Sequence, residues 1–125
     1  ESDGAPRSGL TTIFFLLAAG DASRWHRVAG ADEAWHHYEG APLELLSFAP
    51  DGGQAEVTPL GHDAASRVHV IRAGWWQAAR PTGDYALVGC SVGPGFEFAD
   101  FTMLRDLPAG QRPPRPALAD FERLL

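Results

Sequence analysis

Side chains that could carry chemistry gather between two glycines at positions 20 and 40: Arg24, His26, Glu33, Trp35 and His37. An imidazole beside a carboxylate can act as a general base with an orienting partner. An indole can stack on a ring-shaped ligand, and a guanidinium can pair with an anionic group. This segment predicts a polar centre if its side chains share one face.

A β-hairpin over residues 20–40, with its turn at 30–31, would bring these side chains together. His26 would then face Trp35 across the two strands. Arg24 would face His37, and Glu33 would lie on the same side of the sheet. Such a face is too polar for an ordinary β core and predicts the wall of a ligand pocket. The alternative is a solvent-exposed face, and periodicity leaves both open because the opposite face is no more apolar.

The elements that must position these residues are short strands. Glycine and proline recur every eight to twelve residues or so, which is typical of an all-β sandwich or barrel. The expected strands are Thr11–Leu17, Ser23–Val28, Glu33–Glu39, Leu43–Phe48, Ala55–Leu60, Arg67–Ile71, Trp75–Ala79, Tyr85–Val92 and Phe96–Leu104.

Three segments are expected along the chain. Residues 1–10 form an N-terminal extension, residues 11–107 the barrel, and residues 108–125 a proline-rich segment with a short C-terminal helix. That helix, Ala117–Leu125, places its apolar side chains on one face and is too short to stand alone. It must dock on its own barrel or on that of a partner.

Composition excludes several classes of function. A chain of 125 residues makes one domain, and its net charge of −6 without a basic stretch argues against nucleic-acid binding. No apolar run is long enough to cross a membrane. A single cysteine fits a reducing compartment, so we expect a cytoplasmic protein.

The spacing of the first segment follows a known pattern. From Gly20 to Gly40 the order is Gly, five residues, His, one residue, Val, four residues, Glu, six residues, Gly. This resembles the first conserved motif of the cupin superfamily, with Val28 where a second histidine is usual. Residues 66–77 are similar to the second cupin motif, with Arg72 in place of proline and Gln77 in place of the metal-binding histidine.

Further blocks of sequence between Thr11 and Leu104 resemble one small, single-domain cupin-like family of largely unassigned function. The resemblance implies a cupin-type jelly-roll barrel, a small organic ligand and a homodimer. The dimer would form by exchange of the C-terminal helix or by pairing of edge strands.

The resemblance also implies a metal site, for which this chain offers His26, Glu33 and Gln77. These three could hold one divalent ion, with water in the remaining positions. They could equally form a hydrogen-bonded polar cluster with no cofactor. An amide oxygen is a poor donor to zinc or iron, and the replaced histidines weaken the first interpretation.

Sugar-nucleotide epimerases are metal-free jelly rolls that use a histidine base and a tyrosine acid. By this analogy we expect an isomerase, epimerase or lyase with His26, Glu33 and Tyr85 as catalytic residues. The expected substrate-binding residues are Arg24, Trp35, His37, Trp75 and Gln77. The alternatives are a non-catalytic sensor or carrier of a small metabolite and a metal-dependent oxygenase.

Overall fold

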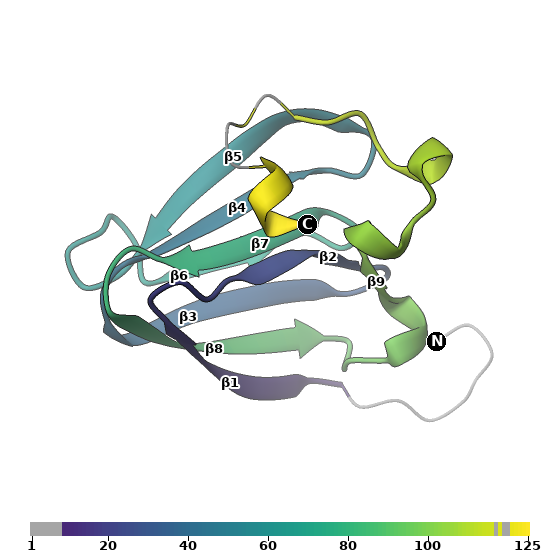
Figure 1. Ribbon diagram of the computed structural model, residues 1–125. Coiled ribbons are helices and arrows are strands. Elements are labelled where there is room, and N and C mark those ends of the chain that lie inside the picture. Colours follow the sequence, from purple (N-terminus) through teal and green to yellow (C-terminus); the bar gives the residue numbers. More distant parts are fainter. Residues whose placement is uncertain (1–8, 117, 119–120) are drawn as a thin grey trace.

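The computed structural model describes residues 9–116, 118 and 121–125, in which two antiparallel sheets pack face to face (Figure 1). The strands are β1 (Thr11–Ala18), β2 (Ser23–Val28), β3 (Asp32–Gly40), β4 (Leu43–Ala49), β5 (Gly52–Leu60), β6 (Val68–Ile71), β7 (Trp76–Pro81), β8 (Tyr85–Gly93) and β9 (Phe101–Met103). The short 3-10 helices are η1 (Phe98–Asp100), η2 (Leu104–Asp106), η3 (Ala109–Gln111) and η4 (Phe121–Leu124). None of these described helices is long and apolar enough to span a membrane.

The all-β jelly roll expected from the sequence is confirmed. One sheet has the order β1-β8-β3-β6 and the other the order β5-β4-β7-β2-β9. The two sheets do not close into one hydrogen-bonded barrel, so the architecture is a jelly-roll sandwich.

The hairpin expected over residues 20–40 is wrong. β2 pairs with β7 and β9, whereas β3 pairs with β6 and β8, so the chain crosses from one sheet to the other between them. Gly30, with φ of 76°, supplies the left-handed backbone for this crossing. His26 and Trp35 are therefore not cross-strand neighbours. They lie on opposite sheets.

The last expected strand, Phe96–Leu104, is wrong over most of its length. Only Phe101–Met103 forms a strand, β9, and it follows the 3-10 turn of η1. A proline at position 94 and a glycine at position 95 precede this segment, and both favour turns over a continuous ladder. The first part of the segment folds over one end of the sandwich, and β9 then adds a short edge strand to the five-stranded sheet (Figure 1).

The inner core fills the space between the sheets. Its buried side chains are Leu17, Trp35, Leu43, Leu45, Leu60, Ile71, Ala79, Ala86, Val88 and Cys90. These residues alternate with outward-facing neighbours along their strands, which is why the strands are recognisable in the sequence.

A second core lies on the outer face of the five-stranded sheet, under the C-terminal segment. It contains Trp25, Leu46, Phe48, Trp76, Ala78, Leu104, Phe121 and Leu124. The Trp25 indole N–H donates to the Phe121 carbonyl at 3.1 Å, and the two rings stack. In this structure the C-terminal segment packs on its own chain, which is one of the two arrangements that the sequence left open.

The expected C-terminal helix is shorter in the described residues than the sequence indicated. Phe121–Leu124 forms one turn of 3-10 helix, while residues 117, 119 and 120 lie outside the described part of the chain. Residues 1–8 of the expected N-terminal extension also lie outside it.

Gly40, the last glycine of the first motif, ends β3 where the backbone passes close to Tyr85. Its φ is 95°, and a Cβ atom at this position would lie 2.5 Å from the Tyr85 carbonyl oxygen. Only glycine fits both constraints, which gives this part of the motif a structural reason.

Candidate functional site

A buried chain of polar side chains connects the two sheets. The Trp35 indole N–H on β3 donates to Gln77 Oε1 on β7 at 2.6 Å. The Gln77 amide nitrogen then donates to Glu33 Oε1 at 2.8 Å. An indole N–H can only donate, so this contact determines which end of the Gln77 amide faces Glu33. The structure therefore brings together three of the expected site residues, Trp35, Gln77 and Glu33.

Glu33 is a carboxyl group held in an apolar surrounding, with 6% of its surface exposed. Burial raises its pKa above the ordinary value, while His26 and hydrogen bonds from Gln77 and the Cys90 thiol lower it in part. The net result is a group that keeps its proton to a higher pH than a solvated glutamate does.

His26 lies close enough to Glu33 for its charge to act on the Glu33 pKa. Its Nδ1 is 2.7 Å from the Arg24 carbonyl oxygen, which can only accept, so Nδ1 carries the hydrogen. In the neutral ring Nε2 is then left with a free lone pair. Phe101 stacks on the ring with 5.5 Å between centroids and limits its rotation.

His26 and Glu33 line a cavity of about 390 Å³ between β1, β2, β3, β8 and the segment after β8. The rest of its wall is mostly apolar: Ile13, Phe15, Val28, Val92, Phe96, Phe98 and Phe101, with Thr11 and Cys90. A largely apolar cavity with a few converging polar groups is the usual form of a small-molecule site.

The aromatic wall of this cavity was missed from the sequence. The Phe96 ring packs edge to face against Phe98 at 5.0 Å and against Phe101 at 5.8 Å between centroids, and Phe98 is 85% exposed. The sequence feature that could have indicated this wall is the run of three phenylalanines within six residues, directly after a glycine-proline turn. Cys90 was also missed, because its position opposite Trp35 depends on the pairing of β8 with β3. Burial raises the pKa of this thiol, and the charge of Glu33 adds to the effect.

Arg24 does not share a face with His26, contrary to the sequence-based expectation. A bulge in β2 sets Ser23 and His26, three residues apart, opposite Ala79 and Gln77, which are two apart. The bulge breaks the alternation of side chains and leaves Arg24 exposed. Its guanidinium donates to the carbonyl oxygens of Arg123 and Leu125.

His37 and Tyr85 are not brought to the cavity. His37 is buried farther along β3, with Nε2 2.8 Å from the Ala41 carbonyl oxygen. Tyr85 alternates with the inward-facing residues of β8 and is directed outward, where its hydroxyl donates to Glu39 at 2.6 Å. The expected tyrosine acid therefore lies on the wrong side of the sheet to meet His26.

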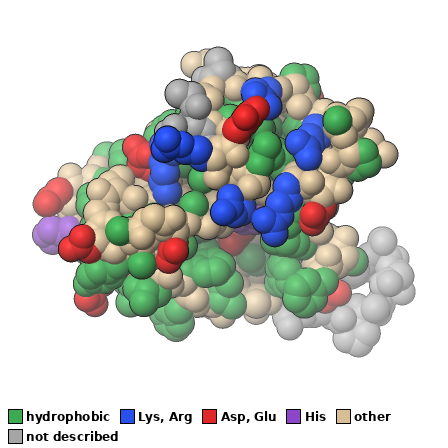
Figure 2. All heavy atoms as spheres, in the orientation of Figure 1, with side chains coloured by type: hydrophobic (Ala, Val, Ile, Leu, Met, Phe, Trp, Pro, Cys, Tyr) green, Lys and Arg blue, Asp and Glu red, His purple; other side chains and the backbone are tan. Residues whose placement is uncertain are grey.

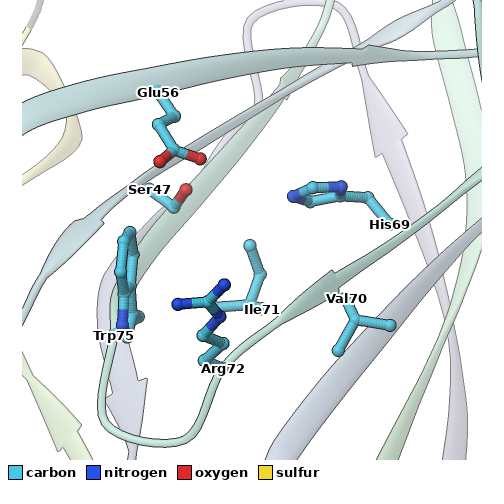
Figure 3. A pocket seen from close by; sticks show the side chains of 7 residues that line it. All are labelled: Ser47, Glu56, His69, Val70, Ile71, Arg72 and Trp75. Carbon is cyan, nitrogen blue, oxygen red and sulfur yellow. The ribbon is translucent and has the colours of Figure 1, made fainter.

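Trp75 lines a different, smaller cavity of about 140 Å³ (Figure 3). The side chains of Ser47 and Glu56 reach it from one sheet and those of His69 and Ile71 from the other. The Arg72 guanidinium lies 5.8 Å from the centre of the Trp75 ring. This cavity does not include His26 or Glu33, and Trp35 lines neither of the two cavities.

The metal site implied by the cupin motifs does not fit the donors present here. Gln77 turns its amide oxygen toward Trp35 and its amide nitrogen toward Glu33, and Val28 has no donor atom. No group of three or more His, Cys, Asp or Glu side chains in the described part of the chain is arranged to hold a metal. His26 and Glu33 alone fall short of the three or four protein ligands that zinc and iron sites use.

Comparison with known proteins agrees with this architecture. A family described as Cupin superfamily (DUF985), Cupin_5, matches residues 1–104. The structure of a protein from Shewanella oneidensis is similar at 33% sequence identity and a TM-score of 0.73. The match covers 80% of this chain and 65% of the Shewanella protein, so this chain spans just under two thirds of that relative.

Two more distant structures share the fold. A hypothetical protein from Leishmania major is 24% identical, with 82% of this chain and 68% of that one covered and a TM-score of 0.71. A dTDP sugar isomerase from Desulfovibrio desulfuricans is 16% identical, with 90% and 74% covered and a TM-score of 0.69. No curated protein matches the sequence.

Proposed function

Because the chain belongs to the DUF985 family of the cupin superfamily, we propose that it binds a small organic molecule beside His26 and Glu33 and moves a proton on it. The reaction class is that of an isomerase, epimerase or lyase. A jelly roll of similar shape is a dTDP sugar isomerase in Desulfovibrio desulfuricans, which supports small-molecule chemistry on this scaffold.

The observation that supports the proposal is the placement of His26 and Glu33 on the wall of one cavity. His26 Nε2 is the base, since Nδ1 is already committed to the Arg24 carbonyl. Glu33 is the acid, since burial raises its pKa. Two titratable groups with different environments are what acid–base catalysis on one substrate needs.

A proton shift next to a carbonyl group is the step that this pair can perform. Nε2 takes the proton from the carbon atom, and the electron pair of the broken C–H bond forms a C=C bond. The Glu33 proton passes to the carbonyl oxygen and gives an enol. Return of the proton from Nε2 to the same carbon exchanges its hydrogen. Where that carbon carries a hydroxyl, return of the proton to the former carbonyl carbon completes an isomerisation, and Glu33 recovers its proton from that hydroxyl as it becomes the new carbonyl group.

Trp35 and Gln77 are positioning residues in this scheme. Their hydrogen bonds hold the Glu33 carboxyl in place without reaching the cavity themselves. Neither a metal ion nor Tyr85 takes part in the step.

Exchange of substrate hydrogen with deuterated water tests the proposal. The protein is incubated in D₂O with carbonyl compounds that include phenylpyruvate, pyruvate and glyceraldehyde, and proton NMR follows the loss of the signal next to the carbonyl. We expect at least one compound to exchange faster with the wild type than with His26→Gln, by about 10²-fold or more. Equal rates with both proteins would rule out the proton-transfer step.

A non-catalytic carrier or sensor is the second candidate, favoured by the small number of polar groups in the cavity wall. It predicts that ligands bind and that no compound exchanges. Binding without exchange in the same experiment would select this function.

We also propose that the chain forms a homodimer through the outer face of the four-stranded sheet and works in the cytoplasm, where Cys90 remains a buried free thiol. That face exposes Phe14, Leu16, Tyr38, Val68 and Val70. A large exposed apolar patch is typical of an interface. Sedimentation at micromolar concentration tests the dimer, and Leu16→Glu should convert it to a monomer.

A further inference from the structure

We propose that the ligand of the His26–Glu33 cavity has an apolar, ring-sized body and a carboxylate at one end. This inference rests on the proposed function, because it names the ligand class of the same cavity. It is carried by the chemistry of the cavity wall and by a second hollow that adjoins it.

The cavity itself suits an uncharged apolar body. Among its described lining residues there is no arginine, and its wall is built mainly of phenylalanine and aliphatic side chains. A sugar or a phosphate placed there would lose its hydration without gaining enough hydrogen bonds in return. A dry cavity of about 150 Å³ already holds benzene, so about 390 Å³ accommodates a substituted ring.

A groove of about 290 Å³ adjoins this cavity and has the opposite character. It shares Phe15, His26 and Phe101 with the cavity, and it adds Arg24 and Arg105. A ligand whose ring occupies the cavity could pass His26 and reach these two guanidinium groups. Arginine is the side chain best suited to bind a carboxylate.

Arginines gather on this side of the molecule, although the whole chain carries a net charge of −6. Figure 2 shows their side chains as a blue cluster over β2 and the C-terminal segment. The arginines of these two regions are Arg24, Arg27, Arg105, Arg112, Arg115 and Arg123. Arg115 pairs with Glu122 at 2.7 Å, and the charges of the other arginines favour an anionic group at the groove.

Arg105 is the better of the two arginines for a test. Arg24 holds the carbonyl oxygens of Arg123 and Leu125, so its replacement would disturb the docked C-terminal segment. The Arg105 side chain forms no ion pair with another residue in the described part of the chain, and the residue is exposed. Arg105→Gln therefore removes the charge and leaves the fold intact.

A pair of probes that differ only in charge gives the measurement. Binding of 3-phenylpropionate and of its neutral amide, 3-phenylpropanamide, is followed by titration calorimetry, and NMR shift changes at His26 confirm the place of binding. We expect the wild type to bind the acid about three- to tenfold more tightly than the amide. Arg105→Gln should bring this ratio close to one and leave the affinity for the amide unchanged.

Two further variants locate the probe. Phe98→Ala should weaken the binding of acid and amide alike, since Phe98 lines the cavity while being 85% exposed and adds little to stability. Arg67→Gln is the matched control, because Arg67 is an exposed arginine whose guanidinium donates to the Tyr38 carbonyl, away from the groove. It should change neither affinity.

Three results would overturn the inference. Equal binding of acid and amide by the wild type would show that the ligand needs no carboxylate. Tighter binding of thymidine diphosphate than of either probe would replace this ligand class by a nucleotide and leave the proposed proton transfer standing. If neither probe binds at millimolar concentration, the cavity does not accept an apolar ring and the inference is wrong. The deuterium-exchange experiment would then test the proposed function independently.

Discussion

The Trp35 indole donates to Gln77 Oε1 at 2.6 Å, and this one hydrogen bond orients the polar centre of the sandwich. It forces the Gln77 amide nitrogen toward Glu33, where it donates at 2.8 Å. Gln77 occupies the position at which the cupin motif places a metal-binding histidine. The residue that replaces the ligand thus connects the two sheets and holds the carboxyl group.

Replacing Gln77 by leucine is expected to destabilise the fold by about 2–4 kcal/mol, because two buried polar groups, the Trp35 N–H and the Glu33 carboxyl, lose a partner. Urea denaturation of the wild type and Gln77→Leu measures the difference. Gln54→Leu, at an exposed position, should stay within about 0.5 kcal/mol of the wild type. Equal stability of the Gln77 and Gln54 variants would show that the chain Trp35–Gln77–Glu33 contributes nothing.

Glu33 is expected to make stability depend on pH. Its pKa is raised above 4.5 in the folded protein, so the folded state binds this proton more tightly than the unfolded state does. Stability from this group is present in full below pH 4.5 and is lost as the pH rises through the folded pKa. Denaturation midpoints are measured at several pH values between about 4 and 8. The stability of Glu33→Gln relative to that of the wild type should increase as the pH rises.

The difference between wild type and Glu33→Gln cancels the titration of the groups that do not interact with Glu33, so the comparison reports on Glu33 together with His26 and Cys90, which do. The amide oxygen introduced by Glu33→Gln can still accept from the Gln77 amide, which keeps the hydrogen bond. A constant difference across the pH range, or one that grows in favour of the wild type, would contradict the raised pKa.

Metal binding should be recoverable by restoring the histidines that the cupin motifs lead one to expect. Val28 lies in the cavity wall beside His26 and Glu33, and Gln77 faces Glu33, so Val28→His/Gln77→His supplies a set of three imidazoles and one carboxylate. We expect nickel or zinc to raise the melting temperature of this double variant, with reversal by a chelator.

The wild type and Val28→His alone are the controls for that experiment, and neither should respond to the metals. A metal-dependent rise in the melting temperature of the wild type would show that His26 and Glu33 bind a metal without further imidazoles. It would then restore the ligand set predicted from the sequence.

Tyr85 is expected to titrate above its ordinary pKa of 10.0, because its hydroxyl donates to the Glu39 carboxylate and loses that bond on ionisation. Ultraviolet titration of tyrosinate absorbance measures this pKa. The titration curve of Tyr85→Phe, in which only Tyr38 ionises, is subtracted from that of the wild type. Glu39→Gln should lower it toward 10.0. An unchanged pKa in Glu39→Gln would show that the contact is absent in solution.

Tyr85→Phe also checks which side of the sheet matters for function. Its hydroxyl is directed away from the His26 cavity, so the variant should keep the deuterium exchange and the probe binding of the wild type. Loss of exchange in Tyr85→Phe would return this tyrosine to the role of catalytic acid that the sequence suggested.

The sequence by itself determined the strands before Phe96 and the all-β class, while its periodicity left open whether His26 and Glu33 face inward. Alternation of apolar and polar residues and the spacing of glycines are local properties, and they are readable along one strand at a time. The motif spacing that identified the family is of the same kind, because it reflects strand and turn lengths.

Only the tertiary structure decided which strands are neighbours, and with that the content of the site. Pairing of β2 with β7 and of β3 with β8 depends on contacts between residues far apart in the chain, and it brought Gln77 and Cys90 to Glu33. A single bulge in β2 moved Arg24 out of the cavity, and strand alternation turned Tyr85 away from it. The aromatic wall after β8 came from a segment that folds over the end of the sandwich, where periodicity carries no information about position.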